Sequence, residues 1–174
     1  GAVLGGKEVA ATEVVTTTTS SVEPVSTKAG ATGVDAAGNK IGVGATDPNW
    51  TVISNILASA ERIGVKPATW AAEPASAAWI GSGSNLPNGV SRFTMQFDLS
   101  GYDPATVFLT GQAATDDGGR LEINGVDMGL SFGFPTIRSF TLEGGASGIT
   151  VDGSNVIPGA FKLGLNEVTM QVDN

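Results

Sequence analysis

Two residue types are missing from this chain of 174 residues, which contains no cysteine and no histidine. Histidine is the most frequent general base in enzymes, and histidine and cysteine are the usual ligands of transition metals. Their absence removes most nucleophile–base pairs and most transition-metal sites. Paired carboxylates of the glycosidase type remain an alternative, but no spacing of acidic residues singles out such a pair. The composition therefore predicts that the protein is not an enzyme.

Charge is sparse and mostly negative. Charged residues make up 15% of the chain, and 9 basic against 17 acidic residues leave a net charge of −8. Phosphate binding needs a clustered basic surface, so this balance argues against nucleic acid as a partner and against an anionic membrane surface. No apolar run approaches the roughly 18–20 residues of a spanning helix, so no membrane span is expected. Abundant Thr, Ser, Gly and Asn with little lysine favour an extracellular location.

Residues 1–46 have no aromatic side chain and almost no large apolar one. They are rich instead in β-branched residues, chiefly Val9, Val14, Val15, Thr16, Thr17, Thr18, Thr19, Val22 and Val25. Such residues favour extended backbone, yet this segment has too little buryable mass to form a core of its own. Pro24 and the glycines from Gly30 to Gly44 then predict a linker. We therefore expect an extended arm with a Gly-rich linker over residues 1–46 and a folded domain over residues 47–174.

The sequence of the folded domain predicts a series of short extended segments. Period-two alternation or β-rich composition predicts strands at residues 50–53, 93–99, 106–112, 120–128, 137–143 and 167–172. Asn124-Gly125 is the dipeptide favoured where both residues of a hairpin turn need φ > 0. Several short strands at such spacing predict an all-β fold, a jelly-roll-like sandwich of two antiparallel sheets.

Six stretches of the folded domain carry a resemblance to a known family: residues 47–52, 79–80, 97–103, 111–117, 123–125 and 165–172. Together they resemble the β-sandwich domain of PEP-CTERM-type bacterial surface proteins. The resemblance implies a galactose-binding-like or jelly-roll fold, secretion to the bacterial cell surface, and a role in biofilm or extracellular matrix. The Pro-Glu-Pro sorting segment of that family does not occur in this sequence, and residues 1–46 have no counterpart in it.

The N-terminal arm is the main candidate for function. A sheet edge offers unpaired N–H and C=O groups, and an extended segment can fill it by strand addition. We expect the strand formers from Val9 to Val25 to complete the sheet of a neighbouring subunit, giving a homo-oligomer or polymer. The alternatives are a first strand folded onto its own domain and an unattached leader.

A carbohydrate-binding module is the alternative function, with a polysaccharide as partner. Trp70 lies between prolines and is expected to be exposed, so Trp70 and Tyr102 could stack on sugar rings. Trp50 and Trp79 are expected in the core, because large aromatics dominate sandwich interiors. The stretch from Phe132 to Pro135 is a second candidate apolar surface.

A calcium ion is the one cofactor that the sequence leaves open. Asp116 and Asp117 precede two glycines between predicted strands, and carboxylates with turn carbonyls suit Ca²⁺. Asp98, Asp103 and Asp127 could complete such a site. A solvated turn is the simpler interpretation, since two adjacent carboxylates fall short of the 6 to 8 oxygens that calcium takes.

Overall fold

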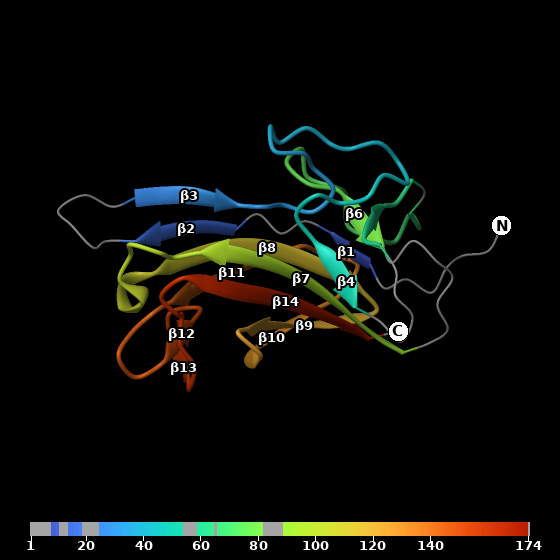
Figure 1. Cartoon of the computed structure of the whole chain (residues 1–174). Coiled ribbons are helices and arrows are strands. Elements are labelled where there is room, and N and C mark those ends of the chain that lie inside the picture. Colours follow the sequence, from blue (N-terminus) through green and yellow to red (C-terminus); the bar gives the residue numbers. More distant parts are fainter. Residues whose placement is uncertain are drawn as a thin grey trace.

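The structure is a computed structural model, and it describes residues 8–10, 14–18, 25–53, 59–64, 66–81 and 89–173. Within residues 8–29, and at Ile53, the description covers the backbone only. In these residues the chain is all-β apart from one short 3-10 helix, η1, at Pro104–Thr106. The predicted sandwich of two antiparallel sheets is confirmed (Figure 1).

The described part of the smaller sheet has five strands in the order β10-β9-β14-β7-β4. Their bounds are Val126–Phe132 for β10, Gly118–Ile123 for β9, Leu165–Asp173 for β14, Val90–Asp98 for β7 and Thr51–Ile53 for β4. Strands β7 and β14 pair over their full length, from Leu165 opposite Asp98 to Asp173 opposite Val90. Alternate residues of β7 are buried, as its period-two pattern predicts, and β14 follows the same period except that Thr169 is buried as well.

The hairpin of β9 and β10 shows why the sequence fixes this sheet locally. Asn124 and Gly125 form its two-residue loop with φ of 50° and 82°, so both occupy the left-handed region. Asparagine and glycine tolerate that region better than other residues, which explains the turn at this dipeptide. Ile123 and Val126 consequently lie opposite each other across the hairpin.

The larger sheet contains nine described strands in the main order β13-β12-β11-β8-β1-β6-β5, with β2 paired to both β3 and β8. Their bounds are Glu8–Ala10 for β1, Val14–Thr18 for β2, Val25–Ala29 for β3, Glu61–Arg62 for β5, Trp79–Gly81 for β6, Phe108–Asp116 for β8, Arg138–Glu143 for β11, Ile149–Val151 for β12 and Asn155–Ile157 for β13. The arm strands β1, β2 and β3 thus belong to this sheet, and β2 and β3 run along the outer side of β8 (Figure 1).

The main core fills the space between the two sheets. Its largest fully buried side chains include Trp50, Phe93, Leu109, Leu121 and Phe140. The expectation that Trp50 and Trp79 are core residues is confirmed, since their exposed fractions are 1% and 0%. Removing this apolar surface from water is the dominant stabilising contribution in a fold of this type.

A second, smaller apolar cluster lies apart from the main core. Its buried members are Ala31, Val34, Trp70, Ala71, Ala77, Trp79 and Ala114. On β6, Trp79 belongs to this cluster while its neighbour Ile80 belongs to the main core. Because neighbouring side chains of a strand point to opposite faces, the larger sheet is covered on both faces at β6.

Two residues of the predicted linker, Ala31 and Val34, are members of this second cluster. Ala31, Thr32 and Val34 are buried, and Thr32 donates a hydrogen bond to the carbonyl of Ala78. Gly33 has φ of 66°, and a Cβ on it would come within 2.7 Å of the Cβ of Ala78. Glycine at this position permits close packing against Ala78, directly before β6.

A turn after the glycines holds this segment in place; we call Asp47, Asn49 and Trp50 the arm clamp. The Asp47 carboxylate accepts hydrogen bonds from the backbone N–H groups of Gly33, Asn49 and Trp50. The Asn49 amide donates to the carbonyls of residues 31 and 34, and the Trp50 indole N–H donates to the carbonyl of Gly30. The arm, residues 1–29, is therefore joined to the rest of the chain at a fixed point, directly before Gly30.

No helix in the described part of the chain is long and apolar enough to cross a membrane.

Candidate functional site

The arm strands line one edge of β8, the central strand of the larger sheet. Strand β1 pairs with the end of β8, with Val9 opposite Thr115, and β2 pairs with its beginning, with Val15 opposite Thr110. The other edge of β8 pairs with β11 over six residues, from Phe108 to Ala113. In this single chain the arm consequently completes the sheet of its own sandwich.

Strand β1 has a second role in the sheet. It pairs with β8 on one side and with β6 on the other, where Val9 lies opposite Ile80. Among the described strands β1 alone joins β8 to β6. A sandwich without its arm would expose the backbone N–H and C=O groups of both strands, which is the edge that an extended segment fills.

The predicted assembly residues divide into two groups. Val9 lies in β1, Val14 to Thr18 form β2, and Val25 begins β3. Thr19 and Val22 lie outside the described residues. The expectation of extended backbone is confirmed for every arm residue that the structure describes.

The predicted sugar-stacking platform does not form, because Trp70 is buried with an exposed fraction of 6%. Its ring packs on that of Trp79, with 4.6 Å between ring centroids and 40° between ring planes. The Trp79 indole N–H donates to the carbonyl of Ala71, which closes this layer over β6. Tyr102 is half-buried in the loop after β7 and is not a member of this cluster. Residues 70–78 therefore form a covering segment over Trp79, in place of the exposed loop that the sequence predicts.

The second predicted apolar surface is also partly internal. Phe132 is buried in the main core and packs edge-on against Phe140 at 5.9 Å. Phe134 is partly buried against the second cluster. Pro135 alone of the apolar side chains in that stretch is exposed.

Asp116 is the last residue of β8 and Asp117 follows it, before β9 begins at Gly118. Among the described residues no group of three or more His, Cys, Asp or Glu could hold a metal ion. The other three acids accept hydrogen bonds within their own turns: Asp98 from Ser100, Asp103 from Ala105 and Asp127 from Gly129. A carboxylate that accepts a hydrogen bond from a backbone N–H two residues further on stabilises the turn in which it lies. These three acids therefore have the role of turn residues.

A basic pocket that no sequence pattern predicts lies beside β5 and the covering segment. We define it by Lys40, Arg62, Lys66 and Glu73; Ile63, Gly64 and Ala72 complete its lining, and its volume is about 350 Å³. Three of the nine basic residues of the chain therefore meet at one place. No sequence motif predicts this pocket, because its lining residues come from separate loops and from β5.

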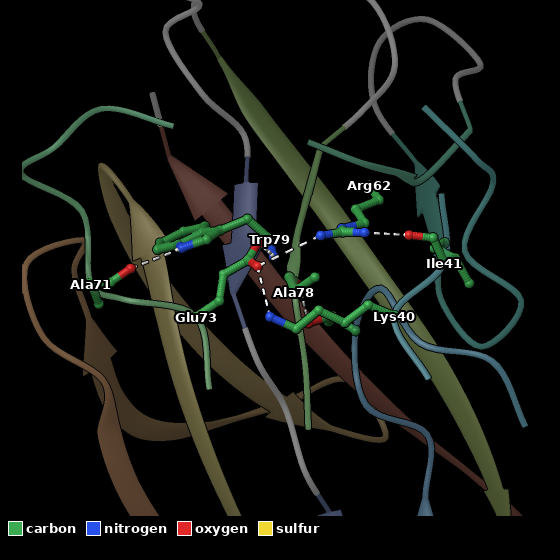
Figure 2. Close-up of polar contacts among 8 residues, drawn as sticks. Lys40, Ile41, Arg62, Ala71, Glu73, Ala78 and Trp79 are labelled. Carbon is green, nitrogen blue, oxygen red and sulfur yellow. Dashed lines mark hydrogen bonds and ion pairs between the residues drawn. The ribbon is translucent and has the colours of Figure 1, made fainter. Parts of the chain in front are cut away.

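Glu73 is the centre of the polar contacts in the pocket (Figure 2). Its carboxylate accepts hydrogen bonds from the Lys40 ammonium at 2.9 Å and from the backbone N–H of Trp79 at 3.0 Å. The Arg62 guanidinium lies 3.9 Å away and also donates to the carbonyl of Ile41. Burial alone would raise the pKa of Glu73, but these hydrogen bonds and cations outweigh burial and hold it below its ordinary value.

Comparisons with known proteins return nothing for this chain: no protein-family model, no curated protein and no solved structure matches it.

Proposed function

We propose that the protein is an extracellular structural subunit of the filament or biofilm-matrix type, which self-associates by exchanging its N-terminal arm. In the assembly, β1 and β2 of one chain pair with β8 and β6 of a neighbour. One observation carries the proposal: β1 is the sole link between β8 and β6 among the described strands. A terminal segment in a central sheet position can be supplied by the same chain or by an identical one.

Exchange requires little change in bonding. The same backbone hydrogen bonds form whether the arm comes from its own chain or from a neighbour. Protein concentration and the geometry of the connection between arm and sandwich therefore decide between the monomer and the exchanged assembly. The arm clamp fixes where the arm starts, directly before Gly30. If each chain gives its arm to the next one, and the rotation that relates successive subunits does not close a ring, the result is a filament. If two chains exchange arms with each other, the result is a dimer.

The sequence composition supports the arm as the exchanging part. Its described strands consist of valine, threonine, serine, alanine, glutamate and lysine, without one large apolar or aromatic residue. Each backbone hydrogen bond contributes only about 0.5–1.5 kcal/mol net. Such a segment forms a strand only against an existing sheet edge, and two copies of the chain offer the same edge.

The size of the full chain in solution, compared with that of a variant lacking residues 1–29, tests this proposal. We expect the full chain to form oligomers whose mass rises with concentration in light scattering, and the shortened chain to remain monomeric. Shortening opens the sheet between β8 and β6 and can prevent folding, so a second variant is needed.

The second variant locks the arm onto its own sandwich. Val15→Cys with Thr110→Cys places two cysteines at opposed positions of an antiparallel pair, about 4.5–5.5 Å apart at Cα, within reach of a disulfide. Oxidised at low concentration, this variant should stay monomeric when concentrated, and reduction should restore self-association. A full-length chain that is monomeric at every concentration, or a locked chain that associates as well as the reduced one, contradicts the proposal.

A further inference from the structure

The basic pocket has hydrogen-bond donors that its own residues do not use. The Lys66 ammonium donates one of its three N–H groups to the carbonyl of Trp70, at 3.2 Å, and the Lys40 ammonium donates one to Glu73. The Arg62 Nε–H is buried and has no hydrogen-bond partner among the described residues. An ammonium group has three donors and no acceptor, so the two lysines retain donors for a ligand that accepts hydrogen bonds.

The pocket also carries excess positive charge. Glu73 is the one carboxylate among its described lining residues, and both of its oxygens are already engaged, by Lys40 and by the Trp79 backbone. Three cations against one anion leave two positive charges uncompensated in a chain whose net charge is −8. Cations half-removed from water gain most from a ligand anion that hydrogen-bonds to them directly.

The volume and the walls restrict the kind of anion. About 350 Å³ is at the lower end of the range for small-molecule sites, roughly 300–1,000 Å³, and is more than an inorganic anion fills. Ile63, Gly64 and Ala72 add an apolar wall beside the cations, which suits the C–H face of a sugar ring. The net charge of −8 opposes a long polyanion, so a single acidic residue fits best.

We propose that this pocket binds one uronic acid residue, a sugar carrying a carboxylate. The carboxylate accepts hydrogen bonds from Lys66 and Lys40, and the ring lies against Ile63. Glu73 acts as a positioning residue, since it holds the Lys40 ammonium and the Arg62 guanidinium on one side of the pocket. This site goes beyond self-association and would attach the subunit to a glycan that carries an isolated uronic acid residue.

Calorimetric titration of the full chain with glucuronic acid, with glucose as the neutral match, tests the proposal. We expect saturable binding of glucuronic acid that weakens as salt is added, and none of glucose at equal concentrations. Lys66→Gln should weaken glucuronic acid binding about tenfold or more, because it removes a charge-assisted hydrogen bond. Lys40→Gln should act in the same direction.

Lys162→Gln is the matched control, because Lys162 is exposed and lies outside the pocket. It removes the same charge and should change the affinity less than about twofold, since exposed and distant charges are screened. Equal binding of glucose, equal binding of inorganic sulfate, or a Lys66→Gln chain that binds as the unmodified chain does would each overturn the proposal. None of these residues lies in the arm strands, so failure here leaves strand exchange as it stands.

Discussion

Replacing Asp47 by alanine should lower the free energy of unfolding by about 2–4 kcal/mol. The side chain is 4% exposed and accepts three backbone N–H groups, from Gly33, Asn49 and Trp50. Alanine leaves these three donors without an acceptor, at about 1–3 kcal/mol for each that stays buried. Relief of the buried charge returns part of that cost. Urea unfolding followed by tryptophan fluorescence measures the difference.

Asp35→Ala is the matched control for this prediction. Asp35 also accepts backbone N–H groups, from Ala37 and Asn39, but in an exposed turn where water replaces the carboxylate. We expect a loss below about 1 kcal/mol there. Equal losses for the two variants would show that Asp47 is an ordinary turn residue and that the arm clamp does not hold the segment before β4.

The pH dependence of Asp47→Asn provides a second readout. Burial raises the pKa of Asp47 above 3.8, although the three backbone hydrogen bonds lower it in part. The folded state then holds this proton more tightly than the unfolded state, so the unmodified chain loses stability as pH rises through the raised pKa. The difference in unfolding free energy between Asp47→Asn and the unmodified chain should therefore change across that pH range and be constant above it. A difference that is constant from below pH 3.8 upward contradicts this account.

Replacing Asn166 by alanine should cost about 2–4 kcal/mol. This residue of β14 is 1% exposed; its Oδ1 accepts from the Lys162 N–H and the Asn124 amide, and its Nδ2 donates to the carbonyls of residues 162 and 164. Truncation leaves these groups unpaired beside the core, so it costs more than the hydrogen bonds alone. Thermal and urea unfolding both report the loss.

Asn166→Asp separates the hydrogen bonds from the shape of the side chain. Aspartate keeps the size and the Oδ1 acceptor, but it sets a carboxylate oxygen against two carbonyls where Nδ2 donated. We expect it to be at least as destabilising as alanine. Asn155→Ala, at an exposed position of β13, should change stability by less than about 0.5 kcal/mol. A stable Asn166→Asp variant would mean that the amide donors are not needed.

Much of the sandwich was predictable from local patterns. The alternation in β7 and β14 and the Asn124-Gly125 turn each encode their structure within a few residues, and all three are confirmed. The hairpin of β12 and β13 was missed, although Asp152 and Gly153 between β-branched residues are a usable turn signal. Its strands of three residues are too short to show a period.

The covering segments were not predictable in this way. Alanine and glycine around residues 30–34 and 70–78 indicated linker and loop, but they are small because the chain packs closely over Trp79. Burial of Trp70 depends on that layer and not on its neighbours in sequence. The basic pocket is also a product of the fold, since Lys40, Arg62 and Glu73 meet only when these segments are in place.

The central claim is that the arm of one chain enters the sheet of another, and mixing two single-cysteine chains tests it most directly. The natural chain has no cysteine, so Val15→Cys and Thr110→Cys chains each carry one thiol. After mixing, incubation and mild oxidation, strand exchange predicts a disulfide between the two different chains. A mixture of Val15→Cys with Ser131→Cys, whose cysteine lies at an exposed position of β10 in the smaller sheet, gives the collisional background. Cross-linking well above that background supports exchange, and cross-linking equal to it contradicts the account.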